Sequence, residues 1–201
     1  MKGFQVVVAM MSQQTLQAVI LAVPPVIQGW RGRRHVRALS RLARVAVRHS
    51  ARRAGSRVGH LVKNSEGVPQ PSHGWHWSVA HKPAYVAGVV GPAPLGIDIE
   101  PYRKRSANLL AKIADEAEWG LGNEDPWCLF YRFWTAKEAV LKAVGTGMRG
   151  LSDCRVVRID GVSHLTLAFR GQQWAVQQCF RDRHWAAVAS RGNPVTWHWP
   201  A

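Results

Sequence analysis

The chain of 201 residues carries 27 Lys and Arg against 12 Asp and Glu, which gives a formal net charge of +15 at pH 7. Its hydrophobic content of 47% and its ten Trp exclude a disordered protein and predict one large globular domain or two small ones. Three Cys without a CxxC pair argue against a disulfide framework or a cysteine zinc site, and no apolar run approaches the roughly 20 residues of a membrane span. We therefore expect a cytoplasmic protein without a membrane partner.

The charge is divided unevenly along the chain. Residues 1–97 hold 13 basic side chains and a single acid, Glu66, whereas residues 98–201 hold 14 basic and 11 acidic ones. Eight of the twelve acids fall between Asp98 and Glu138. This contrast predicts one surface that attracts an anion and another that can hold a cation.

The first half contains a row of arginines at helical spacing. Steps of three or four residues separate its members, Arg34, Arg37, Arg41, Arg44, Arg48 and Arg52. They share one face of a helix expected over residues 33–53, which Gly55 would end. The opposite face, which would pack on a core, holds Val36, Leu39, Leu42, Ala43 and Ala46. Such a row is commonly a solvated surface, but because no acid is interleaved here we expect it to bind an anion.

Strand-like runs follow a loop of turn residues at positions 64–74. The runs cover residues 75–79, 84–90 and 95–99, and their short spacing predicts an antiparallel meander. Helical patterns come next, at residues 106–120 and 126–143, the second ending at Gly145. Four further strands are expected at residues 155–159, 164–169, 174–180 and 185–189.

Each half of the chain therefore runs helix first and strands afterwards. This order predicts an α+β fold of two pseudo-symmetric lobes, each a helix packed on a small antiparallel sheet. We divide the lobes at residues 1–97 and 98–201.

Two short segments carry candidate chemistry. In Gly96-Ile97-Asp98-Ile99-Glu100, the alternation of a strand puts Asp98 and Glu100 on one face. Two carboxylates so close repel each other unless a cation lies between them, and oxygen ligands of this kind suit Mg²⁺. Taken alone, the pair could equally be the solvent-facing edge of a strand. In the second segment, Glu138 and Lys142 share one helix face, a spacing that is usually ordinary helix support.

Together the two segments resemble the paired signature of the 4′-phosphopantetheinyl transferases. Gly-Ile-Asp-Ile-Glu is followed about 35 residues later by Phe-Trp-Thr-Ala-Lys-Glu-Ala-x-x-Lys-Ala, and the pair in this order is far more specific than either half. The longer, two-lobed class that activates surfactin synthetase is the better match, because the first acidic motif lies well inside the chain. The resemblance covers roughly residues 34–190.

The resemblance implies transfer of the phosphopantetheine arm of coenzyme A to a serine of an acidic acyl or peptidyl carrier protein, with release of 3′,5′-ADP. By motif position, Asp98, Glu100 and Glu138 would hold Mg²⁺ or Mn²⁺. The catalytic residues would be Glu138, as general base toward the carrier serine, with Lys142 and Asp98. The implied contacts with coenzyme A are Arg41, Lys63, Ser78, His81, Asp98 and Lys142.

The implied organisation follows the two lobes. Residues 1–97 would bind coenzyme A through the basic helix and loop, and residues 98–201 would supply the metal-binding and catalytic motifs. A monomer is expected, because both lobes lie in one chain.

The chain departs from the family pattern before its first acidic motif. Val68 stands where the family has a lysine, Ala80 where it has a hydroxyl residue, and Ser78 where it has an asparagine. These changes leave open a catalytically degenerate protein that binds coenzyme A or a carrier protein. The basic helix leaves open a nucleic-acid-binding protein. That alternative does not explain the three acids, and we expect no nucleic-acid partner.

Overall fold

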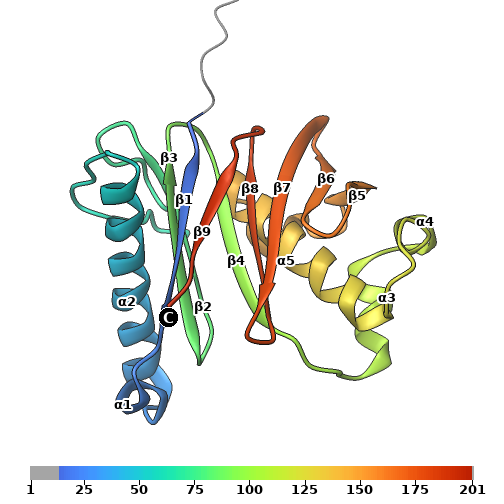
Figure 1. Ribbon diagram of the computed structural model, residues 1–201, viewed down its shortest axis with the longest axis horizontal. Helices are drawn as coiled ribbons and strands as arrows, with labels where there is room; N and C mark the ends of the chain where they lie inside the picture. Colours follow the sequence, from blue (N-terminus) through green and yellow to red (C-terminus); the bar gives the residue numbers. More distant parts are fainter. Residues whose placement is uncertain (1–13, 201) are drawn as a thin grey trace, which may run out of the picture.

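The computed structural model describes residues 14–200 as two β-sheets, each flanked by one long helix (Figure 1). The first sheet has the strand order β2-β3-β1-β9, with β1 at Leu16–Ala22, β2 at His76–His81, β3 at Tyr85–Gly91 and β9 at Val195–His198. The second has the order β4-β8-β7-β6-β5, with β4 at Gly96–Pro101, β5 at Arg155–Ile159, β6 at His164–Phe169, β7 at Gln172–Arg181 and β8 at His184–Ser190.

Two long helices and several short ones accompany the sheets. The long ones are α2 (Gly32–Arg53) and α5 (Pro126–Val144), and the short ones are α1 (Pro25–Gln28), α3 (Leu110–Ile113) and α4 (Glu116–Trp119). Single 3-10 turns lie at η1 (Ala107–Leu109) and η2 (Gly147–Gly150). Within residues 14–200, no helix has both the length and the apolar character needed to cross a bilayer.

The elements stack in four layers, in the order α2, first sheet, second sheet, α5 (Figure 1). Three hydrophobic clusters fill the spaces between them. One lies between α2 and the first sheet, one between the two sheets, and one between α5 and the second sheet. The middle cluster contains Ile97 and Ile99 of β4, so β4 is buried on both of its faces. Burial of this strand positions the candidate site.

The predicted α+β class is confirmed, as are the helix at 33–53, the helix at 126–143 and the four strands of the second half. Gly145 ends α5 in the left-handed conformation, and Gly55 follows α2 with a positive φ. The two sheets differ in strand number, and the first includes a parallel pair, β1 with β9. The expectation of antiparallel sheets is therefore wrong for the first lobe, and pseudo-symmetry stays a prediction.

Three further expectations are corrected by the structure. The third strand of the predicted meander leaves the hairpin, because Pro92 and Pro94 cannot donate to a ladder, and β4 pairs with β8 instead. The helix expected at 106–120 is broken at Ala114, where Asp115 begins a new helix by exchanging hydrogen bonds with Glu118 in a capping box. Val36 of α2 is exposed rather than packed.

Two strands were not predicted, β1 and β9. β9 has only four residues, and β1 is almost continuously apolar, with Gln17 as its one polar residue. They pair with each other across almost the whole described chain, in the register Leu16↔Val195 to Val19↔His198. Periodicity within a segment carries no information about such a distant partner.

Each long helix packs on a glycine of the strand beneath it. At Gly96 of β4, an added Cβ would collide with the Ala139 carbonyl oxygen of α5. Gly96→Ala is therefore expected to destabilise the protein by about 1–3 kcal/mol, because strand and helix backbones would have to separate. Urea denaturation measures this cost. Gly29→Ala is the matched control, since the nearest atom to its added Cβ, Val26 O, lies 3.6 Å away, and equal stability of the two variants would contradict the prediction.

Candidate active site

The two carboxylates of β4 point away from the inter-sheet core. Alternation puts Ile97 and Ile99 into that core, so Asp98 and Glu100 face α5, as the sequence predicts. Asp98 is only 4% exposed and Glu100 6%. A bare carboxylate at such depth is costly, so each requires a cation or hydrogen-bond donors.

Two lysines supply positive charge to this pair. Lys142 Nζ of α5 lies 2.6 Å from Asp98 Oδ1 and donates to the Ile97 carbonyl oxygen at 3.1 Å. Lys82 Nζ lies 2.6 Å from Glu100 Oε1, and the same oxygen accepts a hydrogen bond of 2.9 Å from Trp134 Nε1. Asp98 Oδ2 is buried without a partner among the described residues.

Glu138 is the third acid of the arrangement. It lies one helical turn before Lys142 on α5 and is partly buried. Its pKa is raised by burial and by the negative charge of Asp98, with a smaller contribution from Glu100. Burial and Asp98 likewise raise the pKa of Glu100. The charge of Asp98 therefore disfavours the charged forms of Glu100 and Glu138, and a cation between these carboxylates would relieve this.

The residues present fit a hard divalent cation in chemistry and charge. They offer carboxylate oxygens only, which Mg²⁺ and Mn²⁺ prefer. The unpartnered Asp98 Oδ2 is a free ligand atom. As the side chains lie, no group of three His, Cys, Asp or Glu within residues 14–200 converges to enclose an ion, and two of the carboxylate oxygens are paired with Lys82 and Lys142.

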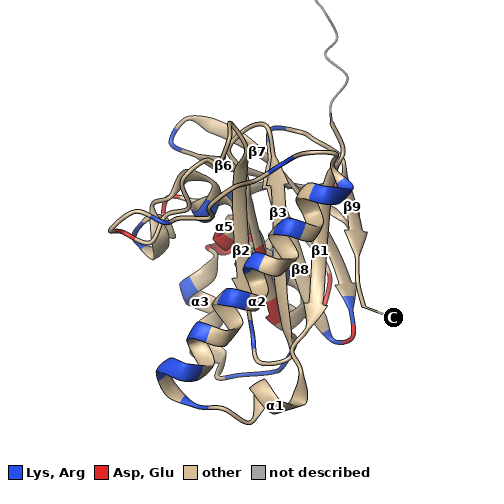
Figure 2. Ribbon diagram, turned by 90° about the vertical axis from the view of Figure 1, so that its left-hand side faces the viewer, with Lys and Arg blue, Asp and Glu red and all other residues tan. Residues whose placement is uncertain are grey.

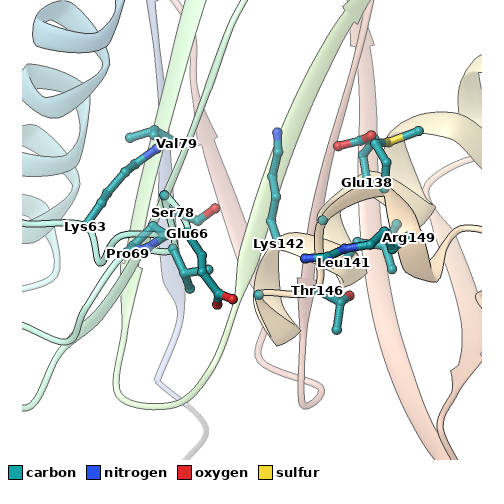
Figure 3. Close-up of a pocket in the computed structure, with 15 residues that line it drawn as sticks. Lys63, Glu66, Pro69, Ser78, Val79, Glu138, Leu141, Lys142, Thr146 and Arg149 are labelled. Carbon is teal, nitrogen blue, oxygen red and sulfur yellow. The ribbon is translucent and has the colours of Figure 1, made fainter.

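A cavity of about 340 Å³ opens beside these acids (Figure 3). One wall is the loop from Lys63 to Pro69 with β2, and the other is α5 with the turn that follows it. In Figure 3, Lys63 lies on the loop side, whereas Glu138, Lys142 and Arg149 lie on the α5 side. The full lining consists of Lys63, Glu66, Gly67, Val68, Pro69, Ser78, Val79, Glu138, Leu141, Lys142, Gly145, Thr146, Gly147, Met148 and Arg149.

Positive charge is concentrated around the cavity. The pKa of His81 is lowered by burial and then by Lys142, Lys63 and Lys82. Burial of its head group in the cavity wall lowers the pKa of Lys63, although much of its side chain is exposed, and the charges of Arg44 and Lys142 add to this. Mutual repulsion among these cations favours an anionic ligand.

Comparison with known proteins agrees with this combination of acids and cations. Residues 94–190, which contain both acidic motifs, match the family model of the 4′-phosphopantetheinyl transferase superfamily. This segment is therefore similar to that superfamily. The recognition made from the two motifs is thereby confirmed.

Two curated relatives carry the same name. The chain is 28% identical over 90 residues to 4′-phosphopantetheinyl transferase gsp of Aneurinibacillus migulanus, an alignment of 43% of this chain and 38% of that protein. It is 32% identical over 94 residues to 4′-phosphopantetheinyl transferase psf-1 of Bacillus pumilus, covering 44% of this chain and 40% of the relative. The chain therefore aligns with about two fifths of the length of these relatives.

The structure brings together most of the residues that the superfamily motifs nominate. Asp98, Glu100, Glu138 and Lys142 form one cluster, while Lys63 and Ser78 line the adjoining cavity. The Ser78 hydroxyl accepts a hydrogen bond of 3.1 Å from the Ile97 N–H. Ser78 thus ties β2 to β4 across the two sheets, besides reaching the cavity.

Arg41 is the exception. It is exposed on α2 and does not line the cavity. Figure 2 shows basic residues recurring along this helix. Arg44 of the same row does influence the site, because its positive charge lowers the pKa of Lys63. It is held by the Leu61 carbonyl oxygen at 3.2 Å and by Ser40 Oγ at 2.6 Å.

Sequence interpretation missed several residues of the site. Thr146, Met148 and Arg149 were not singled out as site residues, although they line the cavity. No periodicity marks them. The only available signal was adjacency, because all three follow the end of α5.

Proposed function

We propose that this protein transfers the 4′-phosphopantetheinyl group of coenzyme A to a serine of an acyl or peptidyl carrier protein. The observation that carries the proposal is the three-acid cluster of Asp98, Glu100 and Glu138, beside a cavity bordered by Lys63 and Lys142. Carboxylates for a divalent ion and ammonium groups for phosphates are what phosphoryl transfer requires. The names of the two relatives support the same reaction.

The proposed step is a substitution at the β-phosphorus of coenzyme A. The serine oxygen forms a bond to that phosphorus, the bond to the oxygen of the leaving phosphate breaks, and 3′,5′-ADP departs. The serine proton passes to Glu138, whose raised pKa makes it a better proton acceptor than an ordinary surface carboxylate. Lys142 lies where it can shift from Asp98 to the phosphates.

We propose Mg²⁺, or Mn²⁺ in its place, as the metal, held by Asp98, Glu100 and Glu138. When bound, the ion neutralises charge on the pyrophosphate oxygens. Binding of the ion there would also remove the repulsion that the three acids impose on one another.

Lys63 and His81 are the proposed contacts for the phosphates of coenzyme A, and Ser78 lies at the cavity wall. The superfamily resemblance also assigns Arg41 to coenzyme A, although Arg41 does not line the cavity. Lys63→Met is expected to weaken coenzyme A binding about 10- to 100-fold, the usual loss for one charge-assisted contact. Calorimetric titration of the folded variant with coenzyme A measures this. Lys104→Met, an exposed lysine outside the cavity, is the control, and equal affinity of both variants would contradict the assignment.

The carrier protein is proposed to be acidic. The net charge of +15 and the exposed arginines of α2 would steer such a partner toward the protein and make its docking sensitive to salt (Figure 2). We further propose a cytoplasmic monomer, in keeping with its three free cysteines. Its lobes would be residues 1–97 and 98–201, with the second lobe contributing β9 to the first sheet.

The test is the intact mass of an apo carrier protein after incubation with this protein, coenzyme A and Mg²⁺. A gain of one phosphopantetheinyl group, lost in the presence of EDTA, is expected. Measurable binding of coenzyme A without any gain on several carriers would instead identify a degenerate binding protein, for which Val68 in the cavity wall is the candidate cause. Binding of neither would overturn the proposal and return the basic helix to a nucleic-acid hypothesis.

A further inference from the structure

Lys82 occupies a defined position at the edge of the acidic cluster. It follows the last residue of β2, and its backbone N–H donates to the Tyr85 carbonyl oxygen at 2.8 Å across the turn to β3. Pro83 follows it, which further restricts the backbone. From this fixed base the side chain reaches from the first sheet to Glu100 of the second.

Lys82 and Lys142 differ in how they are held. Lys142 is anchored twice, on Asp98 and on the Ile97 carbonyl oxygen. The ammonium group of Lys82 has Glu100 as its single partner among residues 14–200, and its side chain is 32% exposed. Lys82 can therefore leave Glu100 for water without breaking another contact.

Glu100, in contrast, is fixed. It is 6% exposed, and the hydrogen bond from Trp134 Nε1 holds Oε1, the oxygen that Lys82 also contacts. The carboxylate is thus positioned whether or not Lys82 is present. Because the carboxylate is fixed and buried while the ammonium group can leave, another cation can replace the ammonium group there.

We propose that Lys82 is a built-in counter-ion of the acidic cluster, which occupies Glu100 in the absence of a divalent ion and competes with that ion for it. The inference rests on the proposed function to the extent that a divalent ion binds there. Because Lys82 must be displaced, a divalent ion alone binds weakly. A phosphate ligand gives the displaced ammonium group a new partner, so metal ion and phosphate ligand strengthen each other's binding.

The experiment measures Mn²⁺ binding by electron paramagnetic resonance, without coenzyme A or carrier. Lys82→Met is expected to bind Mn²⁺ about fivefold more tightly than the unaltered protein, because one competing cation is gone. Lys104→Met, with an equal loss of charge at an exposed lysine that forms no ion pair among the described residues, is expected to change affinity by less than about twofold. Adding Glu100→Gln to Lys82→Met should abolish the gain.

A second variant, Lys82→Gln, keeps a polar side chain and guards against misfolding of Lys82→Met. It is expected to show the same gain, and the gain of both should shrink when coenzyme A is added. Unchanged or weaker Mn²⁺ binding in the folded variants would overturn the proposal, as would failure of all variants to bind Mn²⁺. The readout requires no group transfer, so a protein that transfers but shows no gain refutes only the role of Lys82.

Discussion

Lys137→Met is expected to lower the free energy of unfolding by about 3–5 kcal/mol, the range for breaking a buried ion pair from one side. Lys137 is 2% exposed, and its Nζ lies 2.7 Å from Glu118 Oε1 and 2.6 Å from the Ile113 carbonyl oxygen. Glu118, itself 5% exposed, also accepts a hydrogen bond of 2.8 Å from the Val156 N–H. Removing the ammonium group leaves the carboxylate buried without its counter-charge.

Urea denaturation of the purified variant measures this loss. The matched control is the double variant Lys137→Met with Glu118→Gln, which removes both charges and keeps an oxygen for the Val156 N–H. It should recover most of the stability, because no uncompensated charge remains. A single variant that costs under about 1 kcal/mol, or a double variant no better than the single, would contradict this account. Lys137 therefore ties α5 to Glu118 from a side about 100° around the helix from Glu138.

Glu138→Gln is expected to slow transfer to a carrier protein by about 10²- to 10⁴-fold, the usual contribution of a general base. The same substitution is expected to stabilise the protein without metal by about 1 kcal/mol. The reason is that Glu138, whose pKa is raised by burial and by the charge of Asp98, would no longer place a third negative charge beside Asp98 and Glu100. Loss of activity with gain of stability is the signature of a functional carboxylate rather than a structural one.

Initial rates from intact mass and thermal unfolding without metal measure the two effects. Glu116→Gln is the control, because Glu116 is an exposed acid on α4 without an ion pair in the described part of the chain. It should leave both quantities unchanged within error. Transfer by Glu138→Gln at the rate of the unaltered protein would remove Glu138 from its proposed role.

The sequence predicts the parts of this protein that depend on neighbours along the chain. The strand alternation that turns Asp98 and Glu100 toward α5 and buries Ile97 and Ile99 follows from a period of two. The long helices follow from a period near 3.6 and from glycine at their ends. Both patterns are local, so the structure agrees with them almost residue for residue.

The features that the sequence does not predict depend on contacts between segments that are distant along the chain. A helical wheel predicts which arginines share a face of α2, but not that Arg44 lies near Lys63 while Arg41 faces outward. Lys82 reaches Glu100 only because the two sheets pack against each other as adjacent layers. The parallel pairing of β1 with β9 joins residues separated by most of the described chain, and no turn signal predicts it.

The interlocking of the two sheets has a consequence for a nicked protein. The segment between β4 and α5, residues 102–125, contains only the short helices η1, α3 and α4. A cut there would separate β1 from β9 and β4 from β8 in sequence, yet both pairs would still be hydrogen-bonded across the break. The two fragments should therefore remain associated and reassemble after separation. Asp98 and Glu100 would lie on one fragment and Glu138 on the other. A property that needs all three acids would therefore indicate reassembly.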